Sequence, residues 1–531
     1  MQADYVIVGA GSAGCVVASR LAETGASVVL LEAGPRDWHP MIHIPAGIRS
    51  LIRNPRVNWN FTTEPEKGTG DRRIEWPRGR TLGGSSSING MLYVRGAPAD
   101  FDGWAQMGAR GWSYDDVLPY FMKSESYVQG GDPSVRGQDG PLKVQDYRTI
   151  LPLTHRFVEA AQQAGFPFNP DLNGKTRSGV GYSQMTWRGK YRGSTARTYL
   201  AEARSRPNLT VETNAQAGKL LFNGKRCIGA TFRRGGQLHE VRANREVIVS
   251  GGTVNSPHLL QISGIGPSAH LQSLGIAVTL DLPGVGSNLI DHYVVRVVHR
   301  VHDAVTVNDV ARWPRVFPEI LKFFFTGKGA LTFGVTTSQV FADSREGLAS
   351  PDLQFLFTPG SSHPVKFGQL DEKAGMSCVA CVVKPDSRGT IMAASADPFA
   401  RPAIKPNYLT AHTDALALLS GIRQVRSVFA APALAQHSSG EIQPGPEIQS
   451  DADLLAYARR AGNTLYHPVG TCRMGEDPRA VVDSRLRVRG IEGLRVIDAS
   501  VMPTLTTGNT NAPSIMIGEK GAAMIREDAA A

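Results

Sequence analysis

The stretch "DYVIVGAGSAGCVVASRLAETGASVVLLEAG", residues 4–34, has the pattern of a strand, a glycine turn, a helix and a second strand. Residues 6–8 form a short apolar run, which is typical of a strand buried in a parallel sheet. Gly9, Gly11 and Gly14 then supply the spacing G-x-G-x-x-G. In this spacing the first glycine permits a tight turn, the second lets a pyrophosphate approach the backbone, and the third lets the helix lie close to the sheet. The stretch therefore predicts a βαβ unit that binds a dinucleotide.

Glu32 ends the second of these strands, eighteen residues after Gly14. A carboxylate at this place can accept hydrogen bonds from the ribose of an adenosine. G-x-G-x-x-G alone is a weak signal, but here it is accompanied by both strands, the helix and the acidic residue. Together these features favour a dinucleotide site over an ordinary glycine turn. They do not distinguish NAD from FAD.

The composition bounds the class of protein. A chain of 531 residues, 41% hydrophobic and 20% charged, has a sizeable core and suggests two closely connected domains. The formal net charge is +10, but the basic residues are dispersed and no run of Lys or Arg exceeds two. We therefore expect no nucleic-acid binding, whereas a peripheral attraction to an anionic membrane surface stays open.

Five cysteines, an odd number, imply no disulfide framework. "CVAC" at 378–381 lies in a strand-like run, where two side chains three residues apart point to opposite faces. We therefore expect buried thiols and no metal site. No secretory segment precedes the first strand, and no run of about 18 apolar residues could span a bilayer. The expected location is the cytoplasm, with peripheral contact at the inner membrane surface left open.

A second loop rich in glycine and serine, "GRTLGGSSSINGMLYVRG", occupies residues 79–96. Its backbone N–H groups and hydroxyls can converge on one ligand. Two such loops suit a long cofactor, with one loop at the pyrophosphate and the other near a ring system. A further strand, glycine turn and helix follow in "REVIVSGGTVNSPHLLQISGIG", residues 245–266.

These motifs resemble those of the glucose-methanol-choline (GMC) family of FAD oxidoreductases. Both family signatures are present, as "GRTLGGSSSINGML" and "GTVNSPHLLQISGIG". The C-terminal pattern is present too, in "YHPVGTCRMG" and "RVIDASVMPTLTTGNTNAPSIMIGEK". The resemblance extends from residue 4 to about residue 520. It is closest in character to bacterial choline dehydrogenase-like proteins, aliphatic alcohol dehydrogenases and sorbose dehydrogenases.

The resemblance implies FAD rather than NAD, and it assigns the cofactor contacts. The ADP half would contact Gly9, Gly11, Ser12, Gly14, Glu32 and Ala33, with Ala217 at the adenine. The middle and the flavin end would contact Arg80, Gly83, Gly84, Ser85, Asn89, Gly90, Met91 and Leu92. Asp498 and Ala499 would hold the ribityl and pyrophosphate region, and Asn511, Ala512 and Pro513 would lie beside the isoalloxazine. Some relatives attach FAD through a histidine where this chain has Ile88, so we expect non-covalent FAD.

His467, in "TLYHPVGTCRMG", is the candidate catalytic base. Its own surroundings favour a structural histidine, because a histidine beside proline usually satisfies its nitrogens with backbone groups. The family pattern reverses this interpretation, since alcohol oxidation needs a base with a pKa near neutrality. Asn511 is expected to hold the same substrate oxygen through its amide. His292 is assigned a structural role.

The resemblance implies oxidation of a primary or sugar alcohol to the aldehyde or ketone. His467 would act as base, hydride would pass to flavin N5, and the electrons would go on to a quinone or another acceptor. An oxygen-using alcohol oxidase is the alternative. Less favoured are an enzyme of the hydroxynitrile lyase type, which keeps its flavin oxidised, and a nucleotide-binding module without catalysis.

The predicted fold class is α/β, with a Rossmann-type FAD-binding domain and a discontinuous α+β substrate-binding domain built on an antiparallel sheet. Cofactor motifs at both ends of the chain and near residue 250 place the FAD-binding domain at 1–152, 207–300 and 460–531. The substrate-binding domain takes 153–206 and 301–459. Within it, "VFPEILKFFFTGKGALTFG" (316–334) is predicted to be a core helix. The alternative is that this segment lines an entrance or a lip that faces a membrane.

Overall fold

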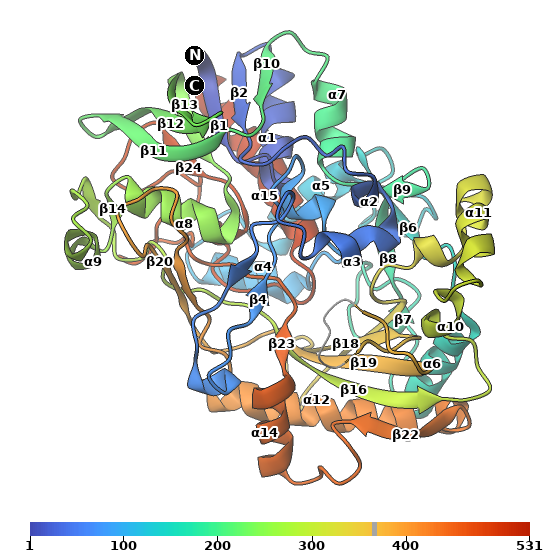
Figure 1. Ribbon diagram of the computed structural model, residues 1–531. Coiled ribbons are helices and arrows are strands. Elements are labelled where there is room, and N and C mark those ends of the chain that lie inside the picture. Colours follow the sequence, from blue (N-terminus) through green and yellow to red (C-terminus); the bar gives the residue numbers. More distant parts are fainter. Residues whose placement is uncertain (364–368, 531) are drawn as a thin grey trace.

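The first of two large sheets carries the N-terminal nucleotide motif (Figure 1). The computed structural model describes residues 1–363 and 369–530. The strand order is β10-β2-β1-β13-β12-β11, and β24 pairs with β13. Their bounds are β1 Gln2–Val8, β2 Val28–Leu31, β10 Leu209–Glu212, β11 Gln216–Asn223, β12 Arg226–Arg234, β13 Gln237–Val249 and β24 Leu494–Val496. The neighbouring strands β10, β2, β1 and β13 are parallel to one another, and β24 pairs with β13 in the same direction. Strands β11, β12 and β13 form an antiparallel meander.

Helices from both ends of the chain pack together on this sheet. Helix α1 (Ser12–Ala22) follows β1, and the C-terminal helix α15 (Asn511–Ala530) lies beside it. Arg20 of α1 donates to the fully buried carboxylate of Glu519 on α15 at 2.7 Å. A third helix, α8 (Gly252–Ile262), begins at the end of β13. The N-terminal loop, the segment near residue 250 and the C-terminus therefore meet at one end of the sheet.

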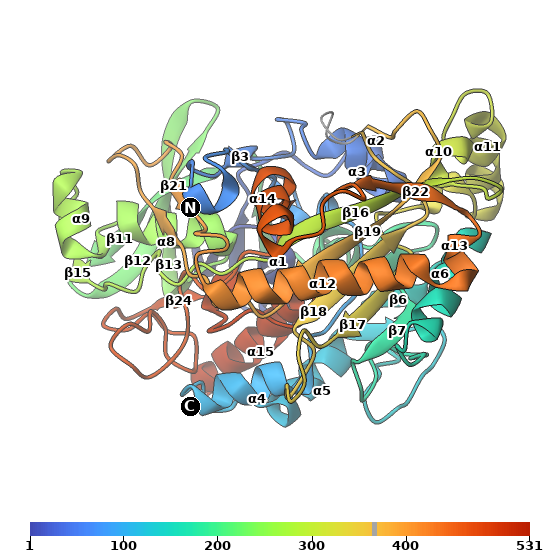
Figure 2. The ribbon, with the colours of Figure 1, turned by 90° about the horizontal axis from the view of Figure 1, so that it is seen from below.

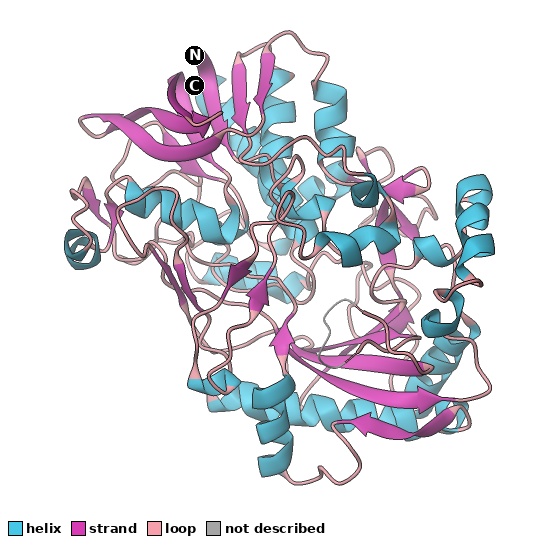
Figure 3. Cartoon of the chain, in the orientation of Figure 1, coloured by secondary structure: helices cyan, strands magenta, loops and turns pink. Residues whose placement is uncertain are grey.

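The second large sheet is antiparallel, in the order β22-β16-β19-β18-β17-β7, with β23 paired to β16. Its strands are β7 Gly179–Tyr182, β16 Tyr293–Val301, β17 Ser338–Ala342, β18 Leu353–Thr358, β19 Gly375–Val382, β22 Ser438–Gln443 and β23 Asn463–Thr464. Helix α12 (His412–Ala430) lies across one face, as Figure 2 shows, and α6 (Pro152–Gln163) packs beside it. Figure 3 shows these strands as a group separate from the first sheet.

Smaller elements connect the two sheets. A four-stranded sheet comprises β5 Glu125–Tyr127, β6 Leu142–Asp146, β8 Gln184–Arg188 and β9 Tyr191–Arg192. The remaining α-helices are α2 Pro40–His43, α3 Ile48–Leu51, α4 Pro98–Gln106, α5 Tyr114–Ser124, α7 Ala201–Ala203, α9 Ser268–Ser273, α10 Val307–Val310, α11 Val316–Thr326, α13 Pro432–Ala435 and α14 Asp451–Ala461. Two-stranded pairs are formed by β3 Phe61–Thr62 with β4 Glu75–Trp76, β14 Ile265–Gly266 with β15 Leu280–Asp281, and β20 Thr390–Met392 with β21 Ala403–Lys405. Within the described part of the chain, no helix is long and apolar enough to cross a bilayer.

The structure confirms the predicted fold class, a Rossmann-type α/β part joined to an α+β part on an antiparallel sheet. The domain boundaries stay a proposal, with one adjustment. Strand β16 pairs with β19, so we move the boundary predicted between residues 300 and 301 to the residue before Tyr293. Residues 364–368 and 531, which fall in the predicted ranges 301–459 and 460–531, lie outside the described residues.

Two local predictions have different outcomes. The thiols of Cys378 and Cys381 are buried on opposite faces of β19, as the strand pattern predicts. The core helix predicted in 316–334 is wrong for α11, because Phe325 is 84% exposed and Phe317 is 51% exposed. The helix forms, but it lies at the edge of the molecule (Figure 1).

Candidate active site

The N-terminal glycine loop lies at the end of β1 and needs glycine for steric reasons. Gly9 has φ +105°, and a Cβ there would lie 2.4 Å from the carbonyl oxygen of Ser250. A Cβ on Gly14 would lie 1.9 Å from the Gly9 oxygen, and one on Gly84 would lie 2.7 Å from the Gly11 Cα. A Cβ on Gly11, by contrast, would have its nearest described neighbour 4.0 Å away. Gly11 therefore faces open space, as a backbone that receives a pyrophosphate must.

Glu32 is buried at the end of β2 and closes this loop. Its carboxylate accepts from the backbone N–H of Ala10 at 3.1 Å and from that of Gly34 at 2.8 Å. Burial raises the pKa of Glu32 to about 7, although the two N–H groups favour its charged form. Ala33, which is half-buried, lies between Glu32 and Gly34. The carboxylate thus stands where the sequence places the adenosine ribose, beside the glycine loop.

The second loop is held against the first one. The backbone N–H of Gly83 donates to the Ala10 oxygen at 2.8 Å, and Gly84 begins a 3-10 helix. Ser85 Oγ accepts from the Gly79 N–H at 3.1 Å. The predicted residues Arg80, Asn89, Gly90, Met91 and Leu92 flank this helix along the same loop. The two loops therefore form one continuous cradle.

Arg192 contributes a buried hydrogen-bond donor without a partner to this cradle. Its guanidinium donates to the side-chain oxygen of Asn89 at 2.7 Å and to the Ile42 oxygen at 2.7 Å. Burial lowers the pKa of Arg192 to about 9. Its Nη2 is buried and has no hydrogen-bond partner among the described residues. Since a buried donor is costly to leave unpaired, a ligand that offers an acceptor fits here.

The C-terminal residues predicted at the cofactor include two, Asn511 and Asp498, whose side chains bond within the protein. Asn511 begins α15, and its side-chain oxygen accepts from Ser12 Oγ at 2.8 Å. Ala512 and Pro513 are buried in the same turn. Asp498 accepts from the Gly252 N–H at 2.9 Å and from Ser256 Oγ at 2.5 Å, so its carboxylate caps α8. Ala499 follows Asp498 in a 3-10 helix, and Ala217 lies half-buried on β11.

A chain of hydrogen bonds sets the tautomer of His467, that is, which ring nitrogen carries the proton. His292 Nε2 lies 3.1 Å from the Val383 oxygen, and this oxygen can only accept, so the ring proton of His292 is on Nε2. His292 Nδ1 then carries no proton and can only accept, and it lies 3.0 Å from His467 Nδ1. His467 must therefore donate through Nδ1 and carry its own lone pair on Nε2. That lone pair faces the side-chain nitrogen of Asn509 at 3.0 Å.

Asp291 fixes the backbone of His467. One carboxylate oxygen accepts from the His467 N–H at 2.8 Å, and the other accepts from Thr464 Oγ1 at 2.5 Å and from the Tyr408 hydroxyl. Burial raises the pKa of Asp291, while these hydrogen bonds lower it. Tyr466, which precedes His467, has φ +67°, an unfavourable conformation that the surrounding contacts must maintain.

Both imidazoles are neutral at pH 7. Burial lowers the pKa of His467 well below its usual value, and the neighbouring His292 and Arg78 lower it further. Burial lowers the pKa of His292 to about 3. His467 Nε2 is therefore unprotonated, and its lone pair accepts the hydrogen bond from Asn509.

The hydrogen-bond partner of His467 is Asn509, so the expected role of Asn511 at the substrate oxygen stays a prediction. Asn509, two residues earlier, donates to His467, whereas Asn511 is held by Ser12 at the start of α1. The reason is geometric: α15 begins at Asn511, which turns that side chain toward the helix pair. The Asn509 side-chain oxygen is buried and unpartnered within residues 1–363 and 369–530. Asn509 is thus a site residue that the sequence does not single out, and His292, which the sequence analysis assigns a structural role, contacts His467.

Comparisons with known proteins identify the family of this chain. The N-terminal profile of the GMC oxidoreductase family matches residues 3–294, and its C-terminal profile matches residues 385–518. An alcohol dehydrogenase [acceptor] from Pseudomonas putida is 42% identical over 528 residues, 98% of this chain and 95% of that protein. The mitochondrial choline dehydrogenase of Homo sapiens is 42% identical over 538 residues, 98% of this chain and 89% of that protein.

A solved structure has the same fold. A formate oxidase from Aspergillus oryzae RIB40, determined in work on FAD modification, superposes with a TM-score of 0.92 at 28% identity. The alignment covers 99% of this chain and 98% of that one. The chain belongs to the GMC oxidoreductase family. It is an FAD-dependent enzyme that oxidises CH–OH groups, which confirms the predictions of family, cofactor and reaction class.

Proposed function

We propose that His467 Nε2 removes the hydroxyl proton of an alcohol while Asn509 holds the same oxygen. The chain from the Val383 oxygen through His292 to His467 carries this proposal, because it leaves the lone pair of Nε2 on the Asn509 side. The side-chain amide of Asn509 can donate to a developing alkoxide, and its unpartnered oxygen can accept a further hydrogen bond. Bound FAD supplies the two-electron acceptor for the carbon-bound hydrogen.

The cofactor would be held by the two glycine loops. Gly11 would offer its open backbone to the pyrophosphate, and Glu32 would accept from the ribose; the space at Gly11 and the burial of Glu32 beside the glycine loop support this. Ile88 packs with Ile42, Leu51 and Val57, and its aliphatic side chain cannot form a covalent bond to the flavin. We therefore propose that FAD is non-covalent, so acid precipitation should release all of the flavin into the supernatant. Flavin that stays with the pellet would overturn this assignment.

A small apolar cluster, which includes residues close in sequence to His292 and His467, supports an uncharged substrate. Val294 is the second residue of β16, and His292 directly precedes this strand. Val294 pairs with Cys381, and these two residues pack with Val383 and Leu465 in a small apolar cluster. A quaternary ammonium group would need a carboxylate or aromatic faces here. Asp291 cannot serve, since both of its oxygens are committed to protein donors.

The experiment is anaerobic bleaching of the flavin by a panel of alcohols. We expect 1-alkanols to reduce the enzyme faster than choline does, and His467→Ala to slow reduction by about 10²–10⁴-fold. If His467→Ala stays within about threefold of wild type, His467 is not the base. Substrate turnover without bleaching would instead favour a lyase.

We further propose that the electrons pass to a quinone rather than to oxygen. The Pseudomonas putida relative is an alcohol dehydrogenase named for an acceptor, which supports this choice. Reoxidation of the reduced enzyme by oxygen and by a soluble quinone should be measured in parallel. We expect the quinone to be faster, and faster reoxidation by oxygen would favour the oxidase.

A further inference from the structure

Helix α11 presents a patch of large apolar side chains to solvent. We call Trp313, Phe317, Leu321, Phe324 and Phe325 the apolar patch; they are 78%, 51%, 43%, 47% and 84% exposed. Soluble monomers seldom expose this many neighbouring large apolar side chains without a binding role. In Figures 1 and 2 the helix lies at the rim of the molecule.

The helix is fixed in the fold by its opposite side. Phe323 is fully buried and packs edge-on against Tyr191, with ring centroids 6.0 Å apart. The Glu319 carboxylate accepts from the backbone N–H of Ala330 at 2.8 Å, so the acidic residue of the helix is turned toward the protein. Lys190 Nζ donates to the Phe324 oxygen at 2.5 Å. The apolar patch is therefore an ordered surface of an anchored helix.

Positive charges surround the apolar patch. Segment 312–328 contains four exposed cations, Arg312, Arg315, Lys322 and Lys328, against the single carboxylate of Glu319. A helix with aromatic and leucine side chains on one face and Lys or Arg around it is typical of binding in the interface of an anionic bilayer. The net charge of +10 adds attraction over a longer range.

The chain that leaves α11 leads directly to the flavin-end loop. Residues 330–332 form a 3-10 helix, and Val335 follows, 40% exposed. A Cβ on Gly90 would lie 2.6 Å from Val335 Cγ2, so Val335 touches the loop assigned to the flavin end. The backbone N–H of Gly334 donates to the Tyr147 hydroxyl at 2.7 Å. A binding partner that contacts α11 would therefore lie close to the loop assigned to the flavin end.

We propose that the apolar patch and its surrounding cations dock the enzyme onto an anionic phospholipid bilayer. The aromatic side chains enter the headgroup region, and the cations pair with lipid phosphates. Docking itself does not depend on the proposed reaction, but it would let an apolar alcohol or a quinone reach the site from the lipid.

The test is co-sedimentation with vesicles. Wild-type holoenzyme should bind phosphatidylglycerol/phosphatidylcholine vesicles and bind phosphatidylcholine vesicles much less, with binding that falls as salt rises. The triple variant Phe317→Ser, Phe324→Ser and Phe325→Ser should lose at least 10-fold in binding to the anionic vesicles. Leu238→Ser, which removes a 65% exposed leucine on β13, is the matched control and should bind as wild type does.

Two further measurements distinguish loss of membrane binding from damage to the active site and from dimer formation. Activity of the triple variant with a soluble dye acceptor should stay within twofold of wild type, which shows an intact site. The proposal is overturned if the wild-type enzyme does not bind anionic vesicles, or if the triple variant binds them as wild type does. It is also overturned if sedimentation velocity shows a wild-type dimer abolished by the same substitutions, because a second copy then covers the patch.

Discussion

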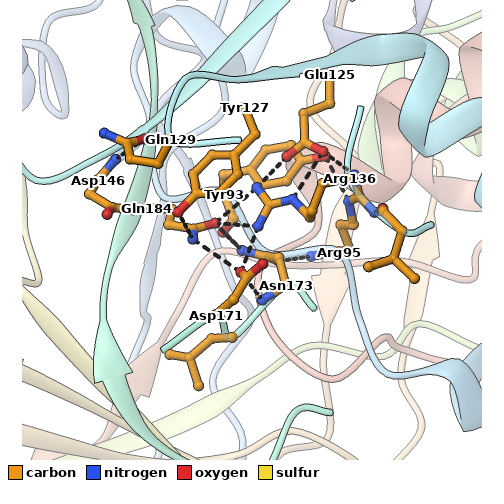
Figure 4. Close-up of polar contacts among 12 residues, drawn as sticks. Tyr93, Arg95, Glu125, Tyr127, Gln129, Arg136, Asp146, Asp171, Asn173 and Gln184 are labelled. Carbon is orange, nitrogen blue, oxygen red and sulfur yellow. Dashed lines mark hydrogen bonds and ion pairs between the residues drawn. The ribbon is translucent and has the colours of Figure 1, made fainter. Parts of the chain in front are cut away.

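Two buried polar regions of this enzyme are built in opposite ways. The first, which we call the arginine network, surrounds Glu125 with Arg95 and Arg136 (Figure 4). These side chains are at most 2% exposed, and both carboxylate oxygens of Glu125 accept from guanidinium groups. Arg136 also donates to Asp171 at 2.6 Å and to Gln184 at 3.2 Å. The carboxylate at the centre of the network is thus satisfied within the protein.

The second region is the site around His467, which is neutral and incompletely paired. Its imidazoles carry no charge at pH 7, because burial lowers the pKa of both His467 and His292. The Asn509 oxygen has no partner among the described residues. In this pair of regions the saturated polar groups stabilise the fold, whereas the unpaired Asn509 oxygen lies at the proposed substrate site.

Removing the centre of the arginine network should have the largest effect on stability. Glu125→Gln leaves Arg95 as a buried cation without its counter-charge and leaves Arg136 with Asp171 alone, at a cost of about 3–5 kcal/mol. We expect a large fall in the thermal midpoint, measured by calorimetry on the holoenzyme. Glu476→Gln breaks the exposed ion pair with Arg110 and should leave the midpoint unchanged. Equal midpoints for the two variants would contradict the role of the network.

The two asparagines should separate chemistry from cofactor binding. Asn509→Ala removes the donor to His467 Nε2 and should slow anaerobic flavin reduction by about 10²-fold. Asn511→Ala removes the contact with Ser12 and should weaken flavin retention while the reduction rate of the loaded enzyme is kept. The reverse pattern in stopped-flow traces would restore Asn511 as the catalytic partner.

His292 should act as a positioning residue. His292→Asn breaks the link from the Val383 oxygen to His467 and should lower kcat by about 10-fold with little change in KM. His302→Asn, on an exposed histidine, is the control and should change neither constant. A His292→Asn variant that raises KM alone would indicate a role in substrate binding instead.

The pH dependence should be the smallest effect near neutrality. The base acts while it is neutral, and protonation on acidification inactivates it. Because its pKa lies well below 6.5, the rate of flavin reduction should stay flat from pH 8 to pH 6.5 and fall only in more acidic solution. An acid limb at or above pH 6.5 would show that His467 is more solvated than the structure has it.

The sequence predicts the backbone-determined parts of this site and misses those set by tertiary contacts. Gly9, Gly14 and Glu32 are predicted because local spacing alone dictates their geometry. The choice between Asn509 and Asn511 depends on where α15 begins, and two asparagines two residues apart carry no such signal. The contact of His292 arises when the start of β16 meets β23, far apart in sequence.

Dependence on distant contacts also explains why the sequence predicts α11 wrongly as a buried helix. Its apolar spacing predicts a buried helix, because amphipathic surface helices and core helices share one periodicity. Which side of the helix meets the fold depends on partners such as Tyr191 and Ala330, which are distant from its own sequence pattern.

One measurement tests the central claim most directly, namely that chemistry resides in the unpaired site and stability in the paired network. It is the rate constant of anaerobic flavin reduction by a 1-alkanol, measured per bound flavin at a temperature where both variants are folded, for His467→Ala and Glu125→Gln together. The account predicts a loss of about 10²–10⁴-fold for His467→Ala and a rate within about threefold of wild type for Glu125→Gln. Equal losses in the two variants, or a near-normal rate in His467→Ala, would contradict it.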